Sequence, residues 1–264
     1  SGFSIYTWNG SSYSKSTTGD SAKIVFHETL TNGSANGSTY YVTANHSIYC
    51  DRGGIAAANR EWRYSSGAPV EANKKLDGAN GAEIRFAVNS SARPGTTFYI
   101  ECKIWQGFGW TDWSRVNFVV VEERTVNYNA NGGSATVSSN VAITDGGTHN
   151  QNVTLPNATR TGYNFLGWYT AASGGTREGG YGTHYMPAQN GTTLYAQWSP
   201  ITYTIKYHAN GGTGTMSDQT MTYNQSAKFN MNQSTHITAG YAFAGWATSS
   251  TGAVAYKNGA EVSN

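Results

Sequence analysis

Polar and apolar residues alternate with a period of two through the first half of this chain. The alternating runs end at turns rich in Asn, Gly and Ser, and no amphipathic helix of ten or more residues stands out. A period of two places every second side chain on one buried face of a strand. Short strands separated by turns predict a β-sandwich over residues 1–123. The expected strands cover 22–27, 38–43, 47–50, 60–64, 83–88, 97–105 and 115–121.

The second half of the chain carries one pattern twice. Each copy begins with a Y-x-A-N-G-G block, at Tyr128 and at Tyr207, and continues to a G-Y-x-F-x-G-W block that ends at Trp168 and at Trp246. The tyrosines are 79 residues apart and the tryptophans 78, which indicates a duplicated structural unit. Alternation predicts strands over 126–130 and 205–209, each followed by an Asn-Gly turn with left-handed backbone.

A glycine directly precedes each of these two tryptophans. A glycine inside a strand indicates a bulge or a close backbone approach, which re-aims the residue that follows it. We therefore predict that Trp168 and Trp246 occupy equivalent buried positions, as core anchors rather than as exposed platforms for sugar.

Three blocks in order carry a resemblance to a known family. They are Y-x-A-N-G-G, then R-x-G-Y-x-F-x-G-W-Y from Arg160 to Tyr169, then L-Y-A-Q-W from Leu194 to Trp198. This order resembles the Listeria/Bacteroides-type repeat, also called the internalin B-repeat, over about 125–199 and less completely over 201–264. The resemblance implies small β-grasp-like domains of secreted or wall-attached bacterial surface proteins, without catalytic activity. It supplies no ligand-binding residues.

The second copy departs from the pattern in two ways. Thr238 stands at the position of Arg160, and Ser234 at that of Pro156. Trp198 follows Trp168 by 30 residues, but the same interval after Trp246 passes the last residue, Asn264. We expect the second copy to lack its final strand. It should then be poorly ordered after Trp246, or be completed by a strand from another molecule through weak self-association.

The predicted β-sandwich over residues 1–123, called the first module below, shows features of immunoglobulin and fibronectin type III domains. Cys50, Trp62 and Cys102 follow the order in which a tryptophan packs on an inter-sheet bridge, so we predict a Cys50–Cys102 disulfide. The alternative is a pair of reduced core cysteines. The predicted protein is mainly β and multidomain: an immunoglobulin/fibronectin III-like β-sandwich (1–123) and two β-grasp-like repeats (124–199 and 200–264).

An aromatic cluster follows the second cysteine. Trp110-Thr111-Asp112-Trp113-Ser114 resembles the W-S-x-W-S element of fibronectin-type domains, whose tryptophans stack on cations, with Lys103 as the expected partner and Arg115 as a second candidate. The other interpretation is a ligand-binding surface that grips a sugar or a protein. Its possible members are Trp105, Phe108, Trp110 and Trp113.

Composition narrows the function. The 264 residues carry a net charge of +2 with 12% charged residues, which argues against nucleic acid as a partner. The sequence contains no long apolar run, so we expect no membrane insertion. The histidines and cysteines show no metal-ligand spacing, and no catalytic motif occurs, so we expect no catalytic residues, no metal and no cofactor.

Two functional hypotheses follow. The first is a non-catalytic protein fragment, extracellular or attached to a bacterial, Gram-positive cell wall, which acts in adhesion or as a stalk. Its partner would be a host-surface or extracellular protein or glycan. The alternative is a carbohydrate-binding accessory module of a polysaccharide-degrading enzyme that uses the aromatic cluster. An enzyme with an unrecognised site is the third and least supported hypothesis.

Overall fold

The computed structural model describes residues 5–15, 23–25, 39–44, 47–51, 60–71, 83–105, 107–235 and 240–263, and within these it contains strands and no helix. The prediction of a mainly β protein is confirmed. The chain divides into two compact units, each built from several segments. Unit 1 comprises Ser1–Asn127, Ser139–Thr154 and His184–Thr193, and unit 2 comprises Tyr128–Ser138, Leu155–Thr183 and Leu194–Asn264. The predicted domain limits stay predictions.

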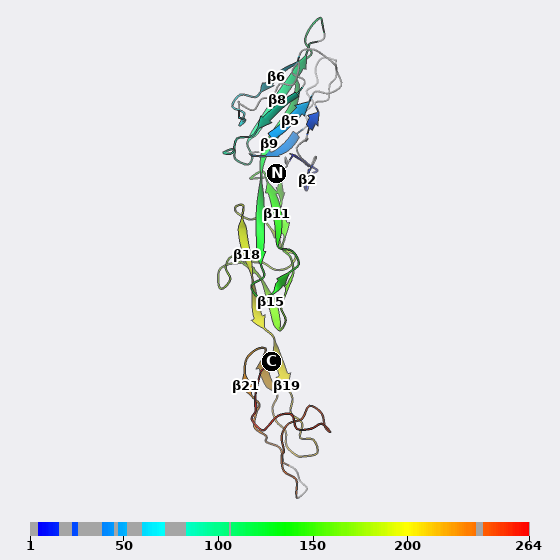
Figure 1. Cartoon of the computed structure of the whole chain (residues 1–264), viewed down its shortest axis with the longest axis vertical. Coiled ribbons are helices and arrows are strands. Elements are labelled where there is room, and N and C mark those ends of the chain that lie inside the picture. The colour runs from blue at the N-terminus through cyan, green and yellow to red at the C-terminus, as the bar shows by residue number, and fades with distance from the viewer. Residues whose placement is uncertain are drawn as a thin grey trace. The chain divides into compact units, whose positions relative to one another are not determined.

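The first half of unit 1 consists of two sheets (Figure 1). The larger has the order β2-β1-β4-β9-β8-β6, with β4 parallel to β9 and the other neighbours antiparallel. The smaller has the order β3-β5-β7. The strands are β1 (Ile5–Trp8), β2 (Tyr13–Lys15), β3 (Lys23–Val25), β4 (Thr39–Thr43), β5 (Ser47–Asp51), β6 (Arg60–Tyr64), β7 (Glu83–Ala87), β8 (Thr97–Ile104) and β9 (Ser114–Asn129).

An apolar core joins these two sheets. Phe86 of the smaller sheet packs at 6.1 Å from the ring of Phe98 and 5.7 Å from that of Phe118, which belong to the larger one. Phe98 and Phe118 themselves stack at 4.9 Å. All three are buried, as the two-sheet prediction requires. Assignment to the immunoglobulin or fibronectin class remains a prediction.

The seven expected strands match β3 to β9, but both ends of the module differ from the prediction. The hairpin of β1 and β2 was missed, although Ile5–Trp8 is an apolar, aromatic run of the kind that favours strands. At the other end, β9 does not stop near residue 121. It continues through the predicted domain boundary at residues 123 and 124 to Asn129. Pairing with a second partner strand explains this, because β11 lies opposite residues 122–127.

The remaining strands of unit 1 come from the segment after the first repeat block. β11 (Ser139–Thr144) pairs with the second half of β9 and turns back through β12 (Asn150–Gln151), and β13 (Val153–Thr154) pairs with β17 (His184–Tyr185). A small aromatic core fixes the β11–β12 hairpin to the N-terminal strands. It consists of Tyr6, Tyr13, Tyr41, Val121 and Ile143, with Trp8 and Val119 at its edge.

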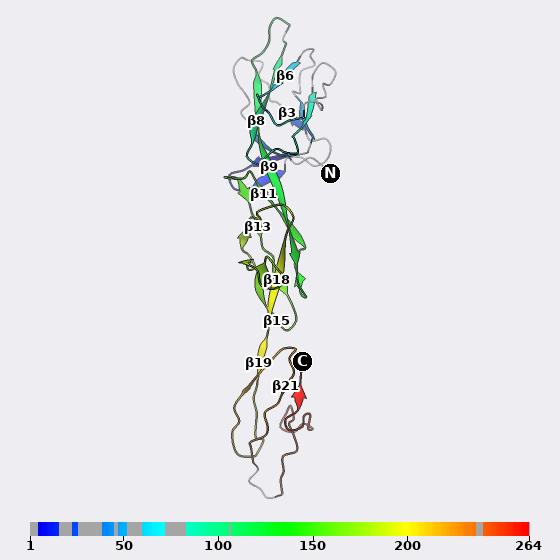
Figure 2. The same ribbon diagram turned by 90° about the vertical axis from the view of Figure 1, so that its left-hand side faces the viewer.

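Unit 2 contains shorter antiparallel pairs. β15 is flanked by β16 and β18, and Figure 2 shows β15 and β18 side by side. The other pairs are β10 with β14, β19 with β20, and β21 with β22. These strands are β10 (Ser134–Ala135), β14 (Ala158–Thr159), β15 (Tyr163–Tyr169), β16 (Arg177–Gly179), β18 (Thr192–Pro200), β19 (Thr202–Ile205), β20 (Gln219–Thr222), β21 (Ala227–Lys228) and β22 (Glu261–Val262).

The predicted local features of the repeats are largely confirmed. The turn asparagines Asn131 and Asn210 have φ of 47° and 46°, in the left-handed region. The register of β15 on β18 shifts between Phe165 and Gly167, which is the bulge that the glycine predicted. In the first copy, Val126 and Tyr128 are buried while their polar neighbours face solvent.

The second copy differs from its predicted strands. β19 ends at Ile205, and residues 206–209 form no strand because its partner β20 begins only at Gln219, opposite Ile205. Residues 241–245 are likewise not in a strand, and Tyr241 and Phe243 are exposed. The chain after Trp246 is nevertheless structured, through the Trp246–Tyr256 bridge and the β21–β22 pair, so a poorly ordered end was the wrong alternative. Completion by another strand stays a prediction.

Candidate ligand-binding surfaces

Aromatic rings alternate with cationic side chains between β6, β8 and the segment before β9. The Lys103 ammonium nitrogen lies 4.7 Å from the ring centroid of Trp110 and 4.8 Å from that of Trp113. The Arg63 guanidinium carbon lies 3.9 Å from the Trp113 ring. Each such contact contributes about 0.5–1 kcal/mol at an exposed site. The predicted stacking of Lys103 on the tryptophans is confirmed.

Arg115 occupies a different place from the one predicted. Its guanidinium stacks on Tyr99 at 3.8 Å, not on a tryptophan. Arg63 was missed, because it reaches Trp113 through the register of β6 on β8, which sets Arg63 opposite Glu101. Both arginines pair with the buried Glu101 carboxylate, at 2.9 Å for Arg63 and 3.4 Å for Arg115. No local spacing in the sequence indicates this arrangement.

The aromatic cluster is only partly exposed. Phe108 is 86% exposed and Trp110 is 42% exposed, while Trp105 and Trp113 are half-buried. The rings of Trp105 and Trp110 are 5.5 Å apart at an interplanar angle of 65°, so these two rings do not form the coplanar pair that would favour a sugar platform. Ligand binding by this cluster stays untested, while the stacking role of Trp110 and Trp113 is visible in the geometry.

The two cysteines lie on strands of different sheets. Cys102 is buried in the core and lies directly opposite Trp62 on the neighbouring strand. The backbone of Cys50 belongs to β5 of the smaller sheet, as the predicted inter-sheet bridge requires. The Cys50 side chain lies outside the described residues, so the disulfide stays a prediction.

The two repeat tryptophans lie in matching surroundings. Trp168 is fully buried and its ring lies 5.0 Å from Tyr128 at 49°, while Trp246 lies 4.7 Å from Tyr207 at 53°. Each also meets the phenylalanine of its own block, edge to face. The predicted match is confirmed for the ring contacts but not for burial. Burial is less complete in the second copy, where Trp246 is half-buried.

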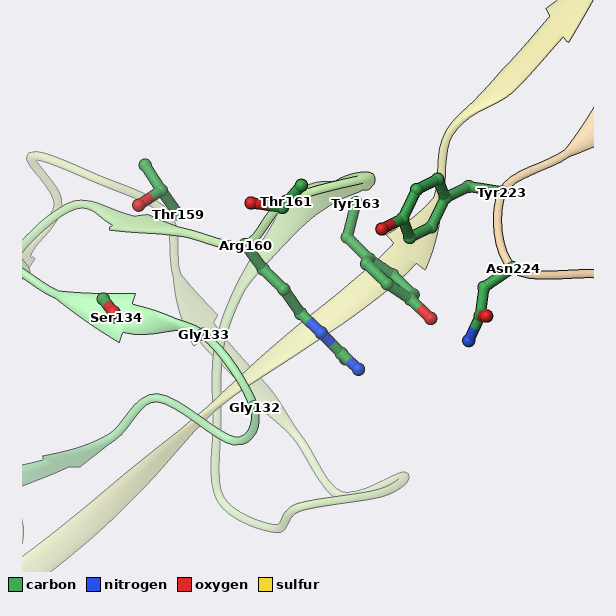
Figure 3. A pocket seen from close by; sticks show the side chains of 9 residues that line it. All are labelled: Gly132, Gly133, Ser134, Thr159, Arg160, Thr161, Tyr163, Tyr223 and Asn224. Atoms are coloured by element: carbon green, nitrogen blue, oxygen red, sulfur yellow. The ribbon is translucent and has the colours of Figure 1, made fainter. Parts of the chain in front are cut away.

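A pocket of about 640 Å³ opens in unit 2 beside the first Asn-Gly turn (Figure 3). The guanidinium carbon of Arg160 lies 3.8 Å from the Tyr163 ring, whose edge meets Tyr223 at 5.6 Å between ring centroids. Backbone hydrogen bonds hold this wall, from the Ile201 amide to the Gly162 carbonyl and from the Tyr223 amide to the Ile201 carbonyl. The sequence did not predict this site. Its lining residues are Gly132, Gly133, Ser134, Thr159, Arg160, Thr161, Tyr163, Tyr223 and Asn224.

A polar cluster borders the aromatic core of unit 1. The His149 ring nitrogen Nδ1 lies 3.0 Å from Asp145, and Trp8 meets the His149 ring at 4.9 Å. The Tyr13 hydroxyl donates to the His149 carbonyl oxygen at 2.6 Å. Burial, with a smaller contribution from Asp145, raises the pKa of Tyr13 well above its usual range. These contacts tie the β11–β12 hairpin to β1 and β2.

The pKa of Asp145 is set by opposing effects. Burial raises it, but amide hydrogen bonds from His149 and Gly147, together with the His149 side chain, outweigh burial and lower the pKa below 3.8. The carboxylate is therefore ionised at neutral pH. Within the described ranges, no group of three or more potential metal-binding side chains occurs. No helix in those ranges is long and apolar enough to span a membrane.

Comparison with known proteins agrees with the two copies seen in the sequence. The model of the Listeria-Bacteroides repeat domain matches residues 125–197 and 203–264, just over half of the chain. The chain therefore belongs to the Listeria-Bacteroides repeat family.

Two relatives share part of the chain. It is 35% identical over 101 residues to a putative Gly-rich membrane protein of Evansella cellulosilytica, a match that covers 36% of this chain and 12% of that protein. It is 35% identical over 94 residues to Internalin H of Listeria monocytogenes, covering 36% of this chain and 16% of Internalin H. The chain thus spans less than a fifth of either relative.

Proposed function

We propose that this chain is part of a non-catalytic, surface-exposed or secreted bacterial protein, in which it acts in adhesion or as a stalk. The observation that carries the proposal is the tandem pair of Listeria-Bacteroides repeats. The 35% identity over 94 residues to a protein named Internalin H supports it. The polar, weakly charged composition suits an extracellular setting.

The stalk role gains support from the continuity of β9. This strand passes from the sandwich into the first repeat without a break, and Tyr6 donates a hydrogen bond to Glu123 at the predicted domain boundary. The contacts of Tyr13 and Trp8 with His149 add a second connection. A connection made of a paired strand is stiffer than a flexible linker, because its backbone amides are already bonded.

The test of this proposal has two stages. Antibody labelling and protease treatment of intact source cells should reach the protein, and failure of both would overturn a surface role. For the stalk, residues 125–264 would be replaced by a Gly/Ser linker of the same length. The replacement should reduce antibody access to an N-terminal tag without changing the amount of protein on the surface. Retained access, with lost binding to host extracellular matrix, would favour adhesion.

Carbohydrate binding through the aromatic cluster is the second candidate. The exposure of Phe108 and Trp110 supports it. The test is a glycan array with the double variant Trp110→Ala/Trp113→Ala, checked for folding by circular dichroism. Because Trp113 also stacks on Arg63 and Lys103, the single variant Phe108→Ala is the cleaner probe of a ligand role. Unchanged binding in both variants would exclude this candidate.

A further inference from the structure

We propose that the pocket around Arg160 binds an acidic saccharide, with the carboxylate of the sugar paired to the Arg160 guanidinium. The proposal deepens the proposed surface role by naming a class of ligand, and it rests on that role only for its biological setting. It concerns a site separate from the Trp110 and Trp113 cluster.

The first argument is the unused hydrogen-bonding capacity of Arg160. Within the described part of the chain, the Arg160 side chain stacks on Tyr163 and makes no ion pair or side-chain hydrogen bond. Stacking occupies a face of the guanidinium and leaves N–H donors at its edges. The residues that line the pocket include this one cation and no carboxylate. A planar carboxylate accepts two parallel hydrogen bonds from such an edge.

The second argument is that Arg160 is already held in place. A Cβ on Gly132 would lie 3.1 Å from the guanidinium carbon, so the arginine packs closely against the turn on one side. The Tyr163 ring covers it on another, as Figure 3 shows. A side chain confined in this way loses less conformational entropy when it binds a ligand.

The third argument is the chemistry of the remaining lining. Ser134, Thr159 and Thr161 carry hydroxyls and Asn224 carries an amide, all suited to hydrogen bonds with sugar hydroxyls. Tyr163 and Tyr223 add aromatic surface. The volume lies within the usual range for small-ligand sites. The single positive charge of Arg160 matches one carboxylate better than it matches the higher negative charge of a phosphate. A peptide carboxylate would pair with Arg160 but would form no hydrogen bonds with the hydroxyl groups of the pocket wall.

The duplicated sequence supplies an internal comparison. Thr238 stands at the position of Arg160 in the second copy. The same motif therefore occurs once with the cation and once without it. The variant Arg160→Thr gives the first copy the residue of the second, and it separates the role of the guanidinium from that of the repeat fold.

The experiment is calorimetric and NMR titration of the full 264-residue chain with sodium glucuronate, glucose, acetate, inorganic phosphate and trialanine. We expect glucuronate to bind the wild-type chain with a millimolar Kd, and each other probe at least about tenfold more weakly. In Arg160→Gln and Arg160→Thr, glucuronate binding should fall at least about tenfold, equivalent to about 1.4 kcal/mol. Arg160→Lys should retain part of it. The control Arg93→Gln, at an exposed arginine outside the pocket, should leave it unchanged.

Several outcomes would overturn the proposal. They are no glucuronate binding, equal binding of glucose, equal binding of acetate or phosphate, tighter binding of trialanine, or full binding by Arg160→Gln. If Arg160→Gln does not fold, the five-probe comparison on the wild-type chain decides alone. Rejection of this proposal would not contradict the surface role, because that role is tested by cell-surface accessibility, without any ligand.

Discussion

The indole nitrogen of Trp168 donates a hydrogen bond of 2.8 Å to the carbonyl oxygen of Pro156. The second copy lacks this bond. Ser234 replaces Pro156 there, and its carbonyl oxygen accepts a hydrogen bond from the Asn232 amide at 3.1 Å. The indole nitrogen of Trp246 is buried without a partner in the described part of the chain. The two tryptophans have the same ring contacts, but only the indole nitrogen of Trp168 has a hydrogen-bond acceptor.

Replacing each tryptophan by phenylalanine should therefore have unequal effects. Trp168→Phe leaves the Pro156 carbonyl without its donor and removes ring volume from a fully buried site, so we expect a loss of about 2–4 kcal/mol. Trp246→Phe removes an unsatisfied donor from a half-buried site and should cost less than about 1 kcal/mol. Hydrogen exchange resolved along the sequence gives the local free energy of opening for each copy. Equal losses would contradict this account.

Gly162 and Gly240 form a second matched pair. Both have positive φ, 80° and 94°, so alanine is strained at either position. A Cβ on Gly162 would collide with the Tyr223 ring, whereas one on Gly240 meets nothing within 4 Å among the residues that the structure describes. We expect Gly240→Ala to cost about 1–2 kcal/mol from strain alone, and Gly162→Ala to cost more. Thermal unfolding of both variants checks the order, and a reversed order would show that Tyr223 is free to move.

The stack of cations and tryptophans should contribute to stability. Lys103→Gln and Arg63→Gln each remove a cation from Trp113, and each should cost about 0.5–2 kcal/mol. Arg63→Gln should cost more, because it also breaks the pair with the buried Glu101. Arg93→Gln serves as the control, since Arg93 is exposed. Urea unfolding followed by tryptophan fluorescence measures the differences. If the variants are as stable as the control, the stack does not contribute to the free energy of unfolding.

The ion pair of Asp145 with His149 predicts a dependence on pH. The pKa of Asp145 is lowered in the folded state, so its contribution is fully present above the unfolded pKa of about 3.9 and is lost as pH falls through the folded value. Compared with Asp145→Asn, the wild-type chain should be more stable at pH 5, by at most about 1 kcal/mol. The difference should shrink as pH falls through the lowered folded pKa of Asp145. Melting curves of both proteins from pH 2 to pH 6 test this, and a constant difference would contradict it.

The predicted Cys50–Cys102 bridge can be tested directly. Under denaturing conditions without reductant, neither cysteine should react with iodoacetamide, and a peptide map should show the two linked peptides. Reduction should then destabilise the chain by about 4 kcal/mol in the loop-entropy model. Complete alkylation of unreduced protein would show two thiols and would remove the bridge from the comparison with immunoglobulin domains.

The sequence by itself determined the features that depend on near neighbours along the chain. Alternation located seven strands of the first module, because the side chains of a strand point to opposite faces. The Asn-Gly pairs marked the turns at Asn131 and Asn210, where left-handed backbone is required. Duplication predicted that Trp168 and Trp246 make matching ring contacts. Each of these signals repeats at a fixed spacing, so no knowledge of distant contacts was needed.

The tertiary structure decided what depends on strand register and on long-range partners. Arg63 reaches Trp113 because β6 pairs with β8. β9 continues past Glu123 because it has further partner strands, β11 and β18. The pocket at Arg160 depends on Tyr223, which lies in the turn directly after β20 and 60 residues further along the chain than Tyr163. Such pairs leave no periodic pattern in the sequence, because the contact is made across space between residues whose neighbours follow unrelated patterns.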